Sequence, residues 1–365
     1  MNISDSSLFD KKRVAKYDVA RVFAILCVIL CHATEAIYHF NQSGWGELSN
    51  HSRVLMLSFF TLGRLGVPLF LFLTGTLILK KTFNKDSDII KFYKKNLVPL
   101  LIVNFSWVII YNIYLELTIN NYDINLFFLL KQFLFLEKVP LSNMWYIPMI
   151  VSVYIGLPFV AKIIKTFSEK TFFWLLLLIF IISFCLPTFN LLYDIFKFNQ
   201  KLFSVIDIYF FGGIYGLYIV LGYFLDKKNK INKIKTIIIL FLTFIITVFF
   251  QFISYNLNSC YNVWYNFPFL LICASCIYLL ILNFNYSKIN NKIINILSFI
   301  SRSSLGMFFV HIIIQNFLSS YITLLNITKP LKVLLLFFVN SIICIFINFI
   351  LSKNKFISKY VLLIK

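Results

Sequence analysis

Three of the ionisable side chains in one apolar segment near the start of the chain, residues 17–40, have a spacing that suits acid–base chemistry. Arg21 and His32 are eleven residues apart, and Glu35 follows His32 by three. In an α-helix eleven residues make three turns plus about 20°, so the first two share a face, with His32 about 16 Å further along the axis. Glu35 can reach His32 from the next turn. A neutral imidazole so placed can take a proton from a hydroxyl.

Each of these residues also has an ordinary structural explanation. Arg21 could extend to lipid headgroups, and His32 could form a hydrogen bond between helices. Glu35 could pair with Arg64 of the next apolar run and hold two helices together. Their joint position on one helix face favours a functional role over the three separate explanations.

Metal chemistry and serine-hydrolase chemistry are poorly supported. His32 and Glu35 have the spacing of metal ligands, but His311 alone could add another, so we predict no metal site. The sequence contains no Gly-x-Ser-x-Gly nucleophile elbow. The seven cysteines fall mostly in apolar runs, where free cysteine behaves as a small buried apolar residue.

The composition places these residues in a membrane. Of 365 residues, 60% are hydrophobic and 13% charged, and the mean hydropathy is +0.85. Soluble domains have about 45–50% apolar and about 25% charged residues. The net charge of +20 does not indicate a nucleic-acid partner, because the basic residues separate the apolar runs and form no patch. Ionisable residues inside spans are costly, which makes them functional candidates.

The predicted fold is all-α: a polytopic membrane bundle of about ten transmembrane helices within residues 17–352. A span needs about 20 apolar residues. The runs are 17–40, 54–79, 94–116, 143–164, 171–190, 203–225, 235–254, 262–283, 298–320 and 331–352. One membrane domain therefore accounts for residues 1–365, and the apolar external stretch 117–142 is expected to lie in the membrane interface.

The loops alternate in basic charge. Lys and Arg on one side number 24, against seven on the other, with three arginines inside or at the edge of spans. Because basic residues are retained on the cytoplasmic side, both termini, residues 1–16 and 353–365, are predicted to be cytoplasmic. The location expected is the cell (plasma or inner) membrane, with lipids as partners.

A series of motifs in this order resembles the membrane acyltransferase 3 family. Arg21 and His32, with ten residues between them, are similar to that family's Arg-x10-His signature. The further segments that resemble the family are Arg64–Gly75, Phe92–Pro99, Met144–Pro158, Phe210–Gly222 and Ser304–His311. Two departures are that Thr74 replaces the usual Ser, and that Lys94 and Lys95 stand where the family often has arginines.

The resemblance implies transfer of an acyl group, usually acetyl from acetyl-CoA, to a hydroxyl of an extracytoplasmic sugar. The implied partners are acyl-CoA and a surface glycan or its lipid-linked precursor. His32 is then the expected base, Glu35 the group that orients it, and His311 a second acid–base candidate. The expected acyl-CoA contacts are Arg21, Arg64, Lys94, Lys95, Trp145 and Tyr146.

Two questions stay open at this level. Transfer can be direct, or can pass through an acylated imidazole. The rival function is an exporter or flippase for a polysaccharide intermediate, which ten helices with a charged interior also fit. Transporters usually contain internal repeats, and none is evident in this sequence.

Overall fold

The computed structural model describes residues 3–40, 48–120, 122, 124–196, 213–228, 230–258 and 264–364, with side chains from Ala15 onward. These residues form helices and turns, and no strand occurs among them. In chain order the elements are α1 (Ile3–Tyr38), α3 (Asn50–Arg64), α4 (Gly66–Ile78), α5 (Asp86–Phe92), the π-helical turn η1 (Tyr93–Leu97), α6 (Val98–Thr118), α7 (Leu126–Phe133), α8 (Tyr146–Thr166), α9 (Glu169–Phe180), the π-helical turn η2 (Ile181–Cys185), α10 (Leu186–Phe196), α11 (Gly213–Lys227), α12 (Lys233–Asn258), α13 (Pro268–Leu282), the short 3₁₀ turn η4 (Tyr286–Lys288), α14 (Asn291–Ile322), α15 (Lys329–Ser352) and α16 (Lys355–Tyr360).

The prediction of an all-α polytopic membrane bundle is confirmed. Eight helical stretches in the described parts of the chain are long and apolar enough to cross a membrane. The predicted runs 203–225 and 262–283 correspond to α11 and α13, which have 15 residues each. A helix of that length extends about 22 Å, less than the hydrocarbon core of about 30 Å. Residues 203–212 and 262–263 lie outside the described residues.

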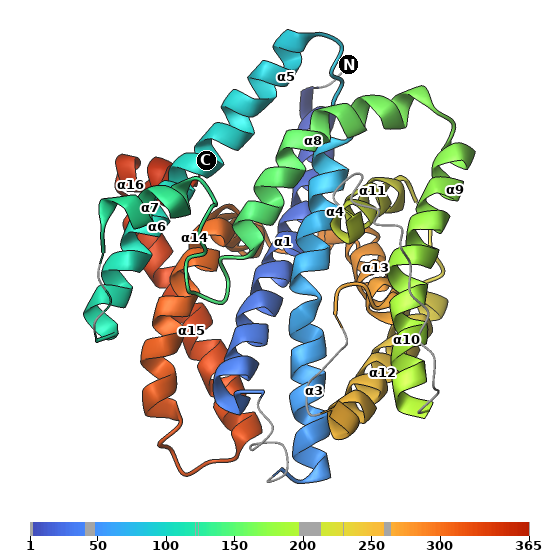
Figure 1. Ribbon diagram of the computed structural model, residues 1–365. Helices are drawn as coiled ribbons and strands as arrows, with labels where there is room; N and C mark the ends of the chain where they lie inside the picture. Colours follow the sequence, from blue (N-terminus) through green and yellow to red (C-terminus); the bar gives the residue numbers. More distant parts are fainter. Residues whose placement is uncertain are drawn as a thin grey trace.

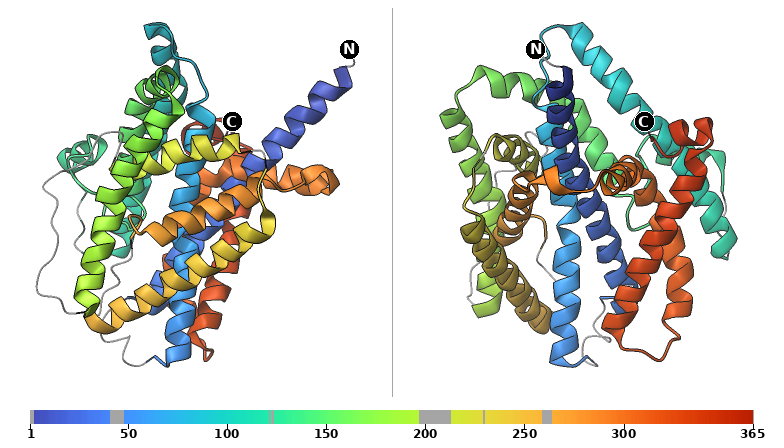
Figure 2. Two further views of the ribbon diagram at one scale, coloured as in Figure 1. Left: turned by 90° about the vertical axis from the view of Figure 1, so that its right-hand side faces the viewer. Right: turned by 180° about the vertical axis from the view of Figure 1, so that it is seen from behind.

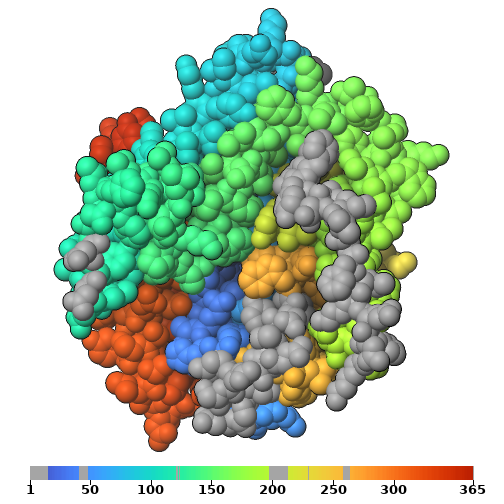
Figure 3. All heavy atoms as spheres, in the orientation of Figure 1, coloured from blue at the N-terminus to red at the C-terminus, as the bar shows by residue number. Residues whose placement is uncertain are grey.

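Helix α1 is the centre of the bundle. It packs against α3, α4, α13, α14 and α15, and Figure 1 shows it running between the α3–α4 pair and the α14–α15 pair. On the face drawn in Figure 3, α1 reaches the surface as a small area beside α14 and α15. The helix with the predicted acid–base residues is therefore the one with most neighbours to position them.

The chain ends lie toward one end of the molecule. Figures 1 and 2 place the start of α1, the α4–α5 turn and α16 there, whereas the start of α3 and the α14–α15 turn lie at the opposite end. This grouping agrees with the alternation of basic and less basic loops. Which end faces the cytoplasm stays a prediction.

Two glycines let α3 and α4 approach α1 backbone to backbone. A Cβ added at Gly63 would lie 2.6 Å from the Cα of Cys31, and one added at Gly66 would lie 2.6 Å from the carbonyl oxygen of Ala24. Small residues at such crossings are typical of membrane helix pairs. The close contact brings Arg64, which lies between these glycines, next to the turn of α1 that carries His32.

Both π-helical turns come just before a proline. The N–H of Val98 bonds the carbonyl of Tyr93 at the end of η1, directly before Pro99. The N–H of Leu186 likewise bonds Ile181, directly before Pro187. Proline has no N–H and its ring collides with the carbonyl four residues back, and a one-residue widening of the helix accommodates that collision.

The external stretch 117–142 contains the short helix α7. Its exposed apolar side chains are Leu126, Phe127 and Leu130. Gln132 on its other face is buried and accepts a hydrogen bond of 2.7 Å from Asn112 of α6. The element is thus amphipathic and attached to the bundle, and its location in the membrane interface stays a prediction.

Candidate active site

His32 and Glu35 form a hydrogen-bonded pair on α1. The distance from Nδ1 of His32 to Oε2 of Glu35 is 2.7 Å. Because a carboxylate only accepts, Nδ1 carries the proton, and the lone pair of the neutral ring is then on Nε2. The His32 side chain is 12% exposed and that of Glu35 is 35% exposed. The helical spacing therefore produces a base whose tautomer is fixed by its neighbour.

His311 of α14 lies against the His32 ring. The two ring centroids are 5.3 Å apart, with 40° between the planes. His311 is fully buried, and its Nδ1–H donates to the carbonyl oxygen of Met307 over 3.1 Å. Its Nε2 has no hydrogen-bond partner among the described residues. The structure thus brings the two predicted histidines together, with His311 the deeper of the two.

A cavity of about 140 Å³ opens beside the pair, and we call it the His32 chamber. Its lining residues are Val28, Cys31, His32, Glu35, Gly63, Arg64, Val67, Phe70, Ser142, Asn143, Trp145, Tyr146, Trp264, Tyr265 and Phe308. Most of these side chains are apolar or aromatic, and His311 is not among them. The chamber has the character of a small-molecule site: apolar walls with a few polar groups that fix orientation.

Arg64 is buried in the wall of the His32 chamber. It is 5% exposed, and its guanidinium carbon lies 3.7 Å from the ring centroid of Trp264 and 4.1 Å from that of Tyr265. Aromatic faces stabilise a cation that has left water. Arg64 was predicted to contact acyl-CoA, and the structure places it in the same chamber as Glu35, away from the cavity that contains Arg21.

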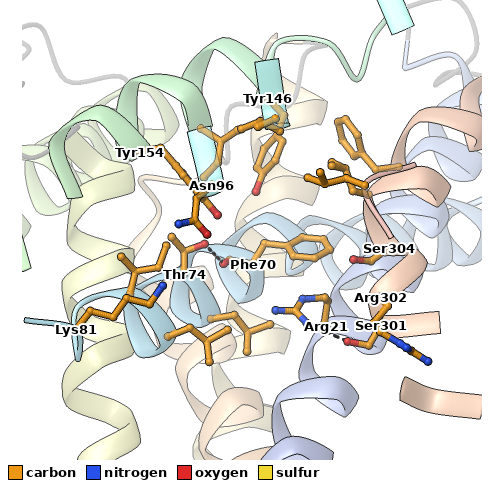
Figure 4. A pocket seen from close by; sticks show the side chains of 18 residues that line it. Arg21, Phe70, Thr74, Lys81, Asn96, Tyr146, Tyr154, Ser301, Arg302 and Ser304 are labelled. Atoms are coloured by element: carbon orange, nitrogen blue, oxygen red, sulfur yellow. Dashed lines mark hydrogen bonds between the residues drawn. The ribbon is translucent and has the colours of Figure 1, made fainter. Parts of the chain in front are cut away.

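That second cavity, the Arg21 chamber, has a volume of about 420 Å³. It is lined by Arg21, Phe70, Leu73, Thr74, Leu77, Ile78, Lys81, Asn96, Leu100, Tyr146, Ile150, Tyr154, Ser301, Arg302, Ser304, Leu305, Phe308 and Leu363. Figure 4 shows Arg21 beneath the ring of Phe70, with Tyr146 on the opposite side of that ring.

Arg21 is held in place by a residue of α14 and a residue of its own helix. Its Nη1 donates to the hydroxyl oxygen of Ser301 over 3.0 Å, and that hydroxyl donates to the Asp18 carboxylate over 2.6 Å. The Arg21–Asp18 ion pair measures 4.0 Å. This arrangement fixes the guanidinium at the cavity wall.

Neither Asp18 nor Ser301 is among the site residues expected from the sequence. Asp18 could have been recognised from the sequence, because it is a carboxylate inside the predicted run 17–40, three residues before Arg21. Ser301 could not, since serine is common in membrane helices and its partner Asp18 is 283 residues away.

Lys94 and Lys95 are exposed on η1 and line neither chamber. The widened turn before Pro99 instead presents Asn96 to the Arg21 chamber, and Lys81 from the α4–α5 turn is the lysine there. Contact of Lys94 and Lys95 with acyl-CoA stays a prediction.

The predicted aromatic pair at the start of α8 lies at the His32 chamber. Trp145 lines it, with its ring centroid 5.8 Å from that of Tyr265. Tyr146 lines both chambers, as do Phe70 and Phe308. The ring centroids of Tyr146 and Phe308 are 5.4 Å apart. Aromatic side chains from α4, α8 and α14 therefore form the common wall of the two cavities.

Asn143 is a polar residue of the His32 chamber that the motifs did not reveal. Its Nδ2 donates to the Tyr111 hydroxyl over 3.0 Å and to the carbonyl oxygen of Phe308 over 3.1 Å. Its Oδ1 is buried without a hydrogen-bond partner among the described residues. An acceptor so held is suited to receive a hydrogen bond from a bound hydroxyl.

Of three comparisons with known proteins, one identifies a family. A family model described as an acyltransferase domain matches residues 14–351. Comparison with curated proteins and with solved structures gives no match. Among the described residues no three His, Cys, Asp or Glu side chains come together as metal ligands. With nearly its whole length matched, the chain belongs to the membrane acyltransferase 3 family.

Proposed function

We propose that this membrane acyltransferase moves an acyl group, acetyl in the simplest case, from cytosolic acyl-CoA to a hydroxyl of an extracytoplasmic cell-surface glycan or its lipid-linked precursor. The observation that carries the proposal is the pair of adjoining chambers. One contains an anchored arginine, the other an oriented imidazole, and the two meet at a single aromatic wall.

The Arg21 chamber suits the donor. Acyl-CoA is a polyanion with a long, flexible arm that ends in the thioester. Arg21 and Lys81 offer positive charge for phosphate groups, while Leu73, Leu77 and Leu100 offer an apolar surface for the arm. The volume of about 420 Å³ is three times that of the other chamber.

The His32 chamber suits a sugar hydroxyl. Trp145, Trp264 and Tyr265 give flat apolar surfaces against which the C–H face of a sugar ring can pack. Asn143 provides a hydrogen-bond acceptor, and Ser142 a hydroxyl. A glycan unit that enters this chamber brings its hydroxyl to the imidazole.

The transfer then proceeds with ordinary acyl chemistry. The Nε2 of His32 takes the hydroxyl proton as the hydroxyl oxygen attacks the thioester carbonyl carbon. Glu35 stabilises the imidazolium that forms. The C–O bond forms, the C–S bond breaks, and the leaving thiolate takes the proton back from the imidazolium, which gives the ester and free CoA.

The test uses the purified protein in liposomes with acetyl-CoA labelled in the acetyl group and lipid-linked glycans extracted from the source cells. We expect label in alkali-labile ester on the glycan, and about 10²–10⁴ times slower labelling with His32→Ala. Movement of glycan across the bilayer without labelled ester would instead establish the exporter and overturn the proposal.

A further inference from the structure

Three aromatic residues are the only residues, in the part of the chain that the structure describes, that line both chambers: Phe70 of α4, Tyr146 of α8 and Phe308 of α14. We call them the aromatic wall. They come from three separate helices, and α4 and α14 both pack on α1. The wall is therefore the boundary between the arginine that suits the donor and the imidazole that suits the acceptor.

The wall is held from several sides. The carbonyl oxygen of Phe308 accepts a hydrogen bond of 3.1 Å from Asn143, and the Phe308 ring packs against Tyr146 and His311 with centroid distances of 5.4 and 6.0 Å. The ring of Phe70 extends into the Arg21 chamber above Arg21, as Figure 4 shows. Side chains packed in this way yield little space to a larger group.

We infer that the aromatic wall is an acyl-size filter, in which Phe70, Tyr146 and Phe308 are the residues that set the length of the acyl group accepted. The inference rests on the proposed function. A donor held in the Arg21 chamber reaches His32 only if its thioester crosses between these rings. The acyl group must then share about 140 Å³ with the acceptor hydroxyl. Each added methylene competes with the acceptor for that space and presses further against the rings of the wall, whereas acetyl brings a single methyl group.

The size of the expected effect follows from other hydrophobic pockets. One methylene changes kcat/KM by about 10- to 200-fold in such sites. The wild-type protein should therefore prefer acetyl-CoA to propionyl-CoA, and propionyl-CoA to butyryl-CoA. Phe70→Ala and Phe308→Ala should each reduce the acetyl-to-butyryl ratio of kcat/KM by at least about tenfold.

Phe72→Ala is the matched control. Phe72 lies two residues from Phe70 on α4 and is fully buried, but it lines neither chamber. Its ring packs instead on Tyr218 and Tyr278, with centroid distances of 5.5 and 5.3 Å. This variant loosens the core of the same helix by the same substitution and should keep the wild-type ratio.

The measurement is acyl transfer to the glycan in proteoliposomes with the three labelled donors. If an alanine variant does not fold, as judged by size-exclusion chromatography, Phe70→Leu and Phe308→Leu replace it and should shift the ratio in the same direction.

Several results would overturn the filter while leaving the proposed function intact. These are a wild-type protein that uses butyryl-CoA as well as acetyl-CoA, wall variants with an unchanged ratio, or an equal shift in Phe72→Ala. A wild-type protein that transfers none of the three acyl groups would instead overturn the proposed function itself.

Discussion

The Nδ1–H of His32 donates to the carboxylate of Glu35 over 2.7 Å, one helical turn further along α1. This bond leaves Nε2 of the neutral ring as the atom that can accept a proton. The Glu35 carboxylate also places a negative charge beside the ring, which stabilises the imidazolium that forms when the ring takes a proton. Base and orienting group therefore come from a single helix and need no other element to bring them together.

Replacement of His32 by alanine should reduce kcat for acyl transfer by about 10²–10⁴, the usual contribution of a general base. The protein should still insert and fold, because a polar contact in a membrane bundle contributes only about 0.6 kcal/mol on average. The measurement is labelled transfer at saturating donor. His51→Ala, an exposed histidine at the start of α3, is the control. Near-normal transfer by well-folded His32→Ala would contradict the mechanism and make His311 the next base to test.

Replacement of Glu35 by glutamine should cost less than loss of His32, because the amide oxygen can still accept from Nδ1. The measurement is kcat for labelled transfer at saturating donor, with His32→Ala assayed beside Glu35→Gln. A loss in Glu35→Gln as large as that in His32→Ala would contradict this role of the carboxylate.

Replacement of Arg21 by alanine should raise the KM for acetyl-CoA by about 10- to 100-fold, the value of a charge-assisted hydrogen bond. Arg21→Lys should recover part of the loss, because lysine lacks the planar fork of donors. With acetyl-pantetheine, which lacks the distal phosphates, the loss should be much smaller. Equal losses with both donors would show that Arg21 acts only through its contacts with Ser301 and Asp18.

Replacement of Asn143 by alanine should raise the KM for the glycan acceptor and leave the KM for acetyl-CoA nearly unchanged, since Asn143 lines the chamber assigned to the acceptor and its Oδ1 has no hydrogen-bond partner among the described residues. Tyr111→Phe is the control for an effect that is only structural. It removes one partner of Asn143, while Tyr111 itself lines neither chamber. If both variants change the acceptor KM equally, Asn143 is structural.

Replacement of Gly63 by alanine should destabilise the bundle by about 1–3 kcal/mol, the usual cost of overpacking, because the new Cβ would lie 2.6 Å from the Cα of Cys31. Gly156→Ala in α8 is the matched substitution, since a Cβ there meets nothing within 4 Å. It should keep or slightly raise the thermal stability in detergent. Equal melting temperatures for the two variants would rule out backbone contact at Gly63.

Local periodicity was enough to predict the pairs within one helix. His32 and Glu35 share a face because of the helical repeat, whereas Trp145 and Tyr146 were expected at the site only from the resemblance to the family. Local periodicity could not predict contacts between distant segments, since nothing in one sequence pairs Arg21 with Ser301. The orientation of Lys94 and Lys95 was also beyond it, because a π-helical turn rotates the residues that precede Pro99 relative to a regular helix.

The glycine contacts of α1 with α3 and α4 have a mechanical consequence. At Gly63 and Gly66 no side chain of α3 or α4 separates the backbones, so the helices resist sliding in small steps there. Backbone contact then sets the position of Arg64 relative to the acid–base pair. Under the proposed function, only the acyl group would pass the aromatic wall, between helices that stay in place, and the large polar donor would remain in the Arg21 chamber.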